Sequence, residues 1–167
     1  MSKKVDRNYL EIQSLDDLVE SKNPSNQFFI ELIDPANFQL NKFFYKNIGK
    51  KHHWVDRLAW TDKQWTDYTG DKKVKTFVLK KQEDLVGYYE LISHLNQNET
   101  EIAYFGILEE YQNQKLGSFL LTSAIKNSFS SNPGRVWVHT CSLDHRNALN
   151  NYISRGMKIF KKETITI

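Results

Sequence analysis

The sequence predicts a mixed α/β fold with helices packed on one sheet, and three features of its second half carry this prediction. Two β-rich segments, Val74 to Leu79 and Leu85 to Ile92, flank a polar break and are typical of an antiparallel hairpin. An apolar run from Ile102 to Leu108 is expected to form a buried central strand. Apolar residues then recur at the spacing of one helix face: Leu116, Leu120, Leu121, Ala124 and Ile125.

The other segments complete this order of elements. In the first half we expect a strand at Tyr9 to Ile12, a capped turn at Ser14 to Leu18, a strand at Phe28 to Ile33 and a helix at Phe38 to Gly49. We also expect a second helix that is capped by Thr61 or Asp62 and turns Trp65 and Tyr68 inward. After residue 130 we expect a strand at Val136 to Cys141, a short helix around Ala148 to Tyr152, and a last strand at Ile159 to Ile167.

Composition indicates one globular domain. The chain has 167 residues, of which 40% are hydrophobic and 26% charged, and its net charge of +3 favours no nucleic-acid partner. The single cysteine, Cys141, excludes an internal disulfide and makes a cysteine-based metal site unexpected. No apolar run of membrane-spanning or signal-peptide length occurs, so we expect a soluble, cytoplasmic protein without a membrane partner.

The junction between the apolar strand and the next helix is the first candidate site. The segment Glu109 to Ser118 joins them, and the start of a helix presents free backbone N–H groups that bind phosphate. Gly117 would let a diphosphate approach the backbone closely. Taken alone, this signal is weak, because many strand–helix turns contain a glycine for reasons of packing.

This junction resembles the fingerprint of the GNAT N-acetyltransferase superfamily. The family pattern is Gln/Arg-x-x-Gly-x-Gly/Ala, and this chain reads Gln112-Asn113-Gln114-Lys115-Leu116-Gly117. Gln112 and Gly117 match, whereas Lys115 replaces the first glycine. Lys115 can still present its N–H to a phosphate if its backbone need not adopt positive φ, and its ammonium is a second possible phosphate contact.

A second block strengthens the resemblance. The family's last catalytic helix reads roughly Asn-x-x-Ala-x-x-x-Tyr-x-x-x-Gly-Phe, and Ala148, Tyr152 and Gly156 match it at the right spacing. His145 replaces the asparagine and Met157 the phenylalanine. The resemblance covers residues 74–167, an implied cofactor-binding core, while residues 1–73 correspond to a variable acceptor-side region of the same single domain. It implies a central, mostly antiparallel sheet whose fourth and fifth strands splay apart in a V.

The resemblance also implies roles for individual residues. Tyr152 is the candidate general acid, with an ordinary half-buried tyrosine as the alternative. Glu101 is the candidate base, with a water chain, Glu90 or a merely solvated carboxylate as alternatives. The implied acetyl-CoA contacts are Phe105, Gly106, Ile107, Gln112, Asn113, Gln114, Lys115, Leu116, Gly117, Ser118, His145 and Ala148. Gly106 is explained either by close approach of the ligand or by tight packing.

Several other polar clusters suggest weaker hypotheses. His139, Cys141, Asp144 and His145 end the fifth strand of the family pattern, where an acyl-cysteine mechanism is conceivable but disfavoured. The pair His52-His53 is poor support for a metal, and we expect none. Three tryptophans, Trp54, Trp60 and Trp65, are expected to form core or an acceptor wall, and Asp56 and Arg57 are candidates for acceptor contact.

The resemblance therefore implies an acyl-CoA-dependent N-acyltransferase that moves an acetyl group from acetyl-CoA to an amine by direct transfer in a ternary complex. A non-catalytic acyl-CoA-binding or partner-binding domain on the same fold is the alternative, and a different acyl group is a further one. Small amines, peptide N-termini and protein lysines all stay open as acceptors. Monomer and homodimer are both open, since Glu163 to Ile167 could pair between two copies.

Overall fold

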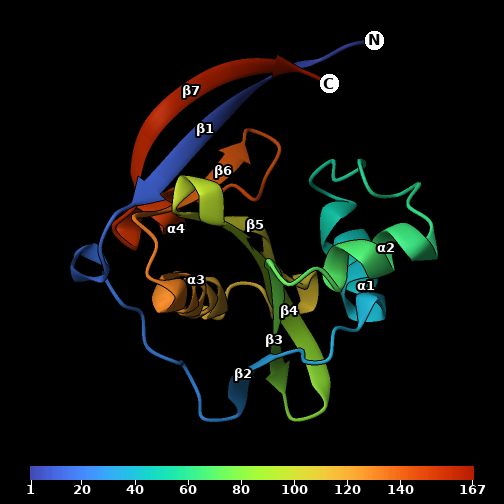
Figure 1. Cartoon of the computed structure of the whole chain (residues 1–167), viewed down its shortest axis with the longest axis vertical. Coiled ribbons are helices and arrows are strands. Elements are labelled where there is room, and N and C mark those ends of the chain that lie inside the picture. Colours follow the sequence, from blue (N-terminus) through green and yellow to red (C-terminus); the bar gives the residue numbers. More distant parts are fainter.

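The computed structural model describes residues 1–167 and contains one seven-stranded sheet, in the order β2-β3-β4-β5-β6-β1-β7 (Figure 1). The strands are Lys4–Ile12 (β1), Phe28–Leu32 (β2), Val74–Lys81 (β3), Asp84–His94 (β4), Glu99–Ile107 (β5), Arg135–Cys141 (β6) and Lys158–Thr166 (β7). Neighbouring strands are antiparallel except β5 and β6, which are parallel. The predicted mixed, mostly antiparallel sheet is confirmed.

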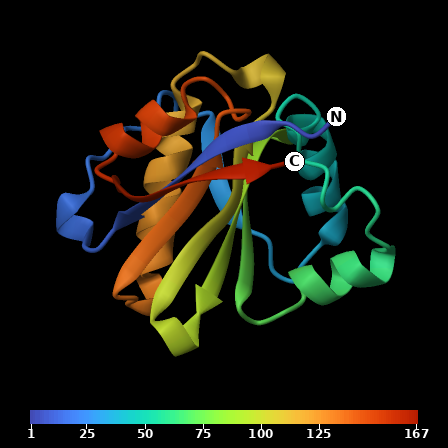
Figure 2. The ribbon, with the colours of Figure 1, turned by 90° about the horizontal axis from the view of Figure 1, so that it is seen from above.

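Four helices cover the two faces of this sheet: Phe38–Gly49 (α1), Asp62–Thr69 (α2), Leu116–Ser128 (α3) and Ala148–Ser154 (α4). Helices α3 and α4 lie together on one face, and α1 and α2 on the other (Figure 2). The Asn37 side chain caps α1, and Thr61 forms a capping box with Gln64 at α2, as polar residues at these positions do. None of the helices combines the length and apolar character that a membrane span requires.

Strands β5 and β6 pair over only a short stretch. Glu99, Thr100 and Glu101 lie opposite Arg135, Val136 and Trp137, and no later residues of the two strands pair. Beyond Glu101 the edge of β5 that faces β6 is therefore free of main-chain pairing. The predicted V-shaped opening is confirmed, and it lies between β5 and β6.

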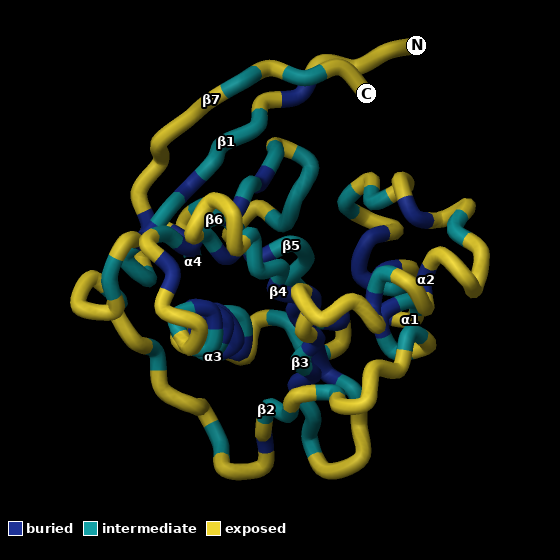
Figure 3. Tube along the Cα trace, in the orientation of Figure 1, coloured by how far each residue is buried: buried dark blue, intermediate teal, exposed yellow.

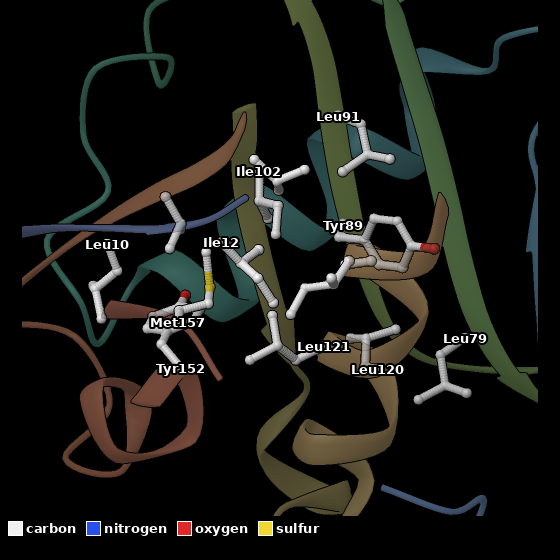
Figure 4. Packing of buried hydrophobic residues seen from close by; sticks show 14 of the residues in the cluster. Leu10, Ile12, Leu79, Tyr89, Leu91, Ile102, Leu120, Leu121, Tyr152 and Met157 are labelled. Atoms are coloured by element: carbon white, nitrogen blue, oxygen red, sulfur yellow. The ribbon is translucent and has the colours of Figure 1, made fainter. Parts of the chain in front are cut away.

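The main core lies between α3 and the sheet (Figure 4). Leu120 and Leu121 of α3 pack among residues of several strands, including Ile102, Leu10 and Tyr89, and are fully buried. A smaller apolar cluster lies under α1, where the Phe44 ring stacks on Tyr88 with 4.8 Å between ring centroids. Buried segments accordingly run along α3 and the middle strands, whereas the connecting loops are exposed (Figure 3).

Strand β5 departs from the expectation of a continuously buried central strand. Ile102 and Leu108 are buried, but the residues between them, Ala103 to Ile107, are only partly buried. The register with β4 also shifts between Glu90 and Leu91, so β5 carries an irregularity at Ala103. The apolar residues in this stretch line an open cavity, which explains why an apolar run is compatible with partial exposure.

Candidate functional site

One large cavity of about 970 Å³ opens where β5 and β6 diverge. Its walls come from β5, β6, the start of α3, the start of α4 and the segment between α1 and α2. The paired termini, β1 and β7, add Val5, Arg7 and Ile165 to Ile167. All the predicted site residues line this cavity except Gln114, which is exposed beside it.

The segment from Gln112 to Gly117 forms the entry to α3. Asn113 and Lys115 both adopt left-handed backbone conformations, with φ of 65° and 63°. The N–H of Lys115 was expected to reach a phosphate on the condition that its backbone need not adopt positive φ, and that condition is wrong. The backbone at this position does adopt positive φ, which explains why glycine is favoured there. Lys115 is the N-cap of α3, and its side chain makes no capping bond. The first N–H groups of α3 are thus left to a ligand or to water.

Gly117 leaves room for a ligand. A Cβ at this position would meet only the Asn151 Nδ2 atom, at an ordinary contact distance of 3.7 Å. The protein's own packing therefore does not demand glycine here. Asn151 Nδ2 also donates to the Gly117 carbonyl at 3.1 Å, which ties α4 to the start of α3. Ser118 is already engaged, because its hydroxyl donates to the Lys115 carbonyl at 3.1 Å.

Gly106 has a packing explanation. A Cβ on this residue would lie 2.7 Å from Cγ2 of Ile48, closer than real contacts allow. Glycine is needed so that α1 can approach β5, and ligand approach is not required to explain it. Phe105, Gly106 and Ile107 nevertheless all line the cavity on the stretch of β5 that β6 has left.

Tyr152 lies on α4 with only 6% of its surface exposed, and it lines the cavity. Its ring centroid lies 6.3 Å from that of Phe105. Burial, and secondarily the negative charge of Asp144, hold the pKa of its hydroxyl well above the usual value. A phenol in this environment keeps its proton at neutral pH.

Glu101 and Glu90, the two carboxylates considered as bases, differ in their surroundings. Glu101 lines the cavity, and its Oε1 atom lies 2.9 Å from Nε2 of His94. Glu90 is fully enclosed and accepts from Arg57 Nη1 at 3.0 Å, from the Tyr68 hydroxyl at 2.6 Å and from Asn41 Nδ2 at 2.8 Å. Glu90 does not line the cavity, and both of its oxygens accept hydrogen bonds, so this carboxylate is a structural ion-pair partner.

Arg57 fixes the segment between α1 and α2. Its guanidinium carbon lies 4.2 Å from the ring centroids of both Tyr68 and Tyr104 and 4.7 Å from that of Trp60. The positive charge of Arg57 is therefore stabilised both by the Glu90 carboxylate and by the surrounding aromatic rings. Although Arg57 borders the cavity, this arrangement does not support the expectation that it contacts an acceptor, whereas Asp56 is exposed there.

The polar residues at the end of β6 and in the loop after it do not form a nucleophile–base pair. The Asp144 carboxylate accepts from the Thr140 hydroxyl and from the Cys141 backbone N–H, so it closes a turn. His139 packs with its ring centroid 5.5 Å from that of Tyr9, and burial lowers its pKa. His145 accepts the Asn147 N–H at 3.1 Å. No group of three or more His, Cys, Asp or Glu side chains is placed to hold a metal ion.

Sequence reasoning missed two residues that shape the site. His94 ends β4 and contacts Glu101, and only the hairpin register, which pairs His94 with Glu99, could have placed it there. His52 Nδ1 lies 3.2 Å from the Leu143 carbonyl, so the α1–α2 segment reaches the loop before α4. No local pattern predicts a contact between residues so far apart in sequence.

With this geometry in place, comparison with known proteins decides the family. Residues 34–157 match the model of the acetyltransferase (GNAT) family. The chain belongs to the GNAT acetyltransferase family. No curated protein matches it. The match begins before residue 74, so it includes α1 and α2, and it ends before β7.

Solved structures of GNAT proteins share its fold. A GCN5-related N-acetyltransferase from Sphaerobacter thermophilus superposes with a TM-score of 0.73 at 12% identity, over 97% of this chain and 50% of that one. A second, from Kribbella flavida, gives 0.68 at 14% identity, over 99% and 58%. An aminoglycoside acetyltransferase from an uncultured soil metagenomic sample, in complex with trehalose, gives 0.62 at 18% identity, over 80% and 90%. The chain thus spans only about half of the first two structures.

Proposed function

We propose that this GNAT domain transfers the acetyl group of acetyl-CoA to a primary amine by direct attack in a ternary complex. The observation that carries the proposal is the single cavity that unites the start of α3, the free edge of β5, Tyr152 and Glu101. On this proposal, residues 74–167 bind the donor, and residues 1–73 supply much of the acceptor side through the α1–α2 segment.

The donor end of the cavity fits a diphosphate. The start of α3 offers uncapped N–H groups, Gly117 leaves the backbone open, and the Lys115 ammonium adds positive charge. Bound there, acetyl-CoA would supply an acetyl thioester whose carbonyl carbon accepts the amine. The unpaired edge of β5 at Phe105 to Ile107 can then hydrogen-bond to the amide groups of the pantetheine arm.

Two side chains account for the proton transfers. On this proposal Glu101, which lines the cavity, takes a proton from the acceptor ammonium, because a neutral amine is needed for attack. As the C–N bond forms and the C–S bond breaks, the Tyr152 hydroxyl gives a proton to the sulfur, and the proton that the nitrogen then loses restores it. Direct transfer is favoured over an acyl-cysteine route because no hydrogen bond joins Cys141 to His139 or His145.

The acceptor is proposed to be a small-molecule amine. The α1–α2 segment encloses the cavity with Trp54, Val55 and His52, which limits the room for a folded protein substrate. The similarity to an aminoglycoside acetyltransferase gives one class of polyamine to include in a screen.

Calorimetric titration of acetyl-CoA tests the donor site first. We expect saturable micromolar binding to the wild type and loss of binding in Gly117→Trp, whose indole would fill the phosphate position. Lys72→Trp, an exposed substitution outside the cavity, is the matched control and should bind normally. No binding to the folded wild type would refute the proposal. Binding without turnover across a broad amine panel would instead favour the non-catalytic alternative.

A further inference from the structure

Glu101 is connected to the outside of the molecule by one side chain. Its carboxylate belongs to the cavity wall and is 16% exposed, while its partner His94 is 31% exposed and does not line the cavity. His94 also borders a separate groove, together with Lys73 and Ser93. The imidazole therefore gives this carboxylate a second connection to bulk water, apart from the cavity.

The geometry of this pair is fixed by the sheet. Glu101 Oε1 and His94 Nε2 are 2.9 Å apart, which is hydrogen-bond distance. The His94 ring stacks on Trp137 of β6, with 6.1 Å between centroids and 18° between planes. Glu101 and Trp137 are themselves paired in register across the short β5–β6 ladder. The imidazole is thus held between its carboxylate partner and an indole face.

No other charged group competes for the imidazole. Glu99 lies opposite His94 in the β4–β5 ladder, but its carboxylate accepts from Arg135 Nη2 at 2.8 Å. Arg135 in turn also donates to Glu11 at 3.0 Å, so these three charges form a closed network. Lys73, from the loop before β3, borders the outer groove and lies within 3.9 Å of Asp71. Glu101 is the one carboxylate that His94 contacts.

We propose that His94 relays the acceptor's proton from Glu101 to solvent. The inference rests on the proposed acetyl transfer. The acceptor ammonium gives one proton to Glu101, Glu101 passes it to Nε2 of His94, and the opposite ring nitrogen releases one proton to water. The second proton lost by the nitrogen ends on the thiol through Tyr152, so the reaction releases one proton overall. His94 acts through Glu101 and does not touch the substrate, so it is a positioning and relay residue.

The relay answers a physical need of this site. A carboxylate enclosed beside a ligand must lose its proton again before the next turnover, and an imidazole exchanges protons readily near neutral pH. The cavity side of Glu101 is covered when donor and acceptor are bound. His94 does not line the cavity and stays in contact with water, because its side chain is 31% exposed and borders the outer groove.

Two variants of His94 separate relay from scaffolding. His94→Gln keeps an amide that can donate to Glu101 but cannot relay a proton, and His94→Ala opens a space that free imidazole can enter. We expect both to lower kcat/KM for the amine by about ten- to a hundredfold at pH 7 with acetyl-CoA affinity unchanged. The deficit should shrink as the pH rises towards 10, because about 30% of a lysine-like amine is neutral at that pH. Added imidazole should restore the activity of His94→Ala. Asn96→Ala, in the same outer groove, is the control and should retain full activity.

The outcomes distinguish the relay from the proposed function. A deficit independent of pH, a fully active His94→Gln, or failure of imidazole to rescue His94→Ala overturns the relay while leaving the acetyl transfer standing. A wild type that binds acetyl-CoA but acetylates no amine overturns both. Independently of activity, the ¹⁵N NMR shift of Nε2 in His94 should change in Glu101→Gln and not in Glu99→Gln. An unchanged shift would mean that the pair does not form, and would sink the relay alone.

Discussion

Tyr152 combines burial with access to the cavity, which makes it the residue whose chemistry is most directly testable. Replacing it with phenylalanine removes only the hydroxyl, so we expect kcat to fall by about ten- to a thousandfold, in the range for loss of one acid catalyst. Acetyl-CoA affinity, measured by calorimetry, should be unchanged because the ring remains beside Phe105.

A second buried tyrosine controls for the loss of a buried hydroxyl. Tyr89 donates or accepts in a bond of 2.9 Å with Ser123 in the main core, away from the cavity. Tyr89→Phe should lower thermal stability but leave kcat unaltered. Equal kcat values for Tyr152→Phe and the wild type would remove Tyr152 from the mechanism.

At this scale the sequence was informative where residue type and geometry coincide. Gly117 and Tyr152 occupy family positions, and both line the cavity. Lys115 was less predictable, because a lysine in the sequence does not indicate the left-handed backbone conformation that this residue adopts. The role of His94 was not predictable either, because its contact with Glu101 depends on strand register, which no short motif encodes.

At the scale of elements, α1 and β5 pack so closely that only a residue without a Cβ, Gly106, fits between them. In Gly106→Ala the added Cβ would lie 2.7 Å from Ile48 Cγ2, so either α1 or β5 must shift. We expect a loss of about 1–3 kcal/mol in the free energy of unfolding, the usual cost of overpacking. Chemical denaturation measures it.

Gly117→Ala provides the matched comparison for this stability effect. Its Cβ would make only an ordinary 3.7 Å contact, and alanine in a helix is about 0.5–1 kcal/mol more favourable than glycine. This variant should be as stable as the wild type or more so. When Gly106→Ala is combined with Ile48→Ala, the double mutant should lose less free energy of unfolding than the two single mutants lose together. Strict additivity would contradict a direct clash.

Most elements were predictable because hydrophobic periodicity and caps are local signals. The β3–β4 hairpin, α1 and α2 all occur where the pattern indicated. The irregularity at Ala103 and the enclosure of Glu90 were not predictable, because both depend on partners that lie far away in the chain. Arg57 reaches Glu90 across 33 residues, and its surrounding rings come from three separate elements and a loop.

For the whole molecule, the topology explains why segments from the whole length of the chain border one cavity. The parallel contact of β5 with β6 is short, so the sheet divides into β2–β5 and β6–β1–β7, and α3 packs on residues of both parts, such as Ile102 and Leu10. The paired termini arch beside this opening (Figure 1). Residues from both ends of the chain therefore meet at the site, which a motif confined to residues 101–157 could not reveal.

The same placement of buried groups at the opening predicts how folding responds to pH. Burial, and then the charge of Arg7, lowers the pKa of His139, outweighing the opposite influence of Glu101, Asp144 and Glu163. The folded state therefore resists protonation that the unfolded chain accepts below about 6.5. Because the unfolded chain then binds more protons, stability should fall as pH drops from about 7 towards 5. The lowered pKa values of Glu109 and Glu163 act in a separate window below about 4.3.

Thermal unfolding between pH 5 and 8 measures this dependence. His139→Gln should flatten the decline in Tm below pH 6.5, since glutamine accepts no proton in either state. The exposed His53→Asn, which suits the left-handed backbone at that position, controls for the loss of one imidazole elsewhere. An unchanged decline in His139→Gln would mean that the histidine is protonated as readily in the folded protein as in the unfolded chain. The β6 wall of the cavity would then have to admit water around His139, contrary to the packing of its ring against Tyr9 and Trp137.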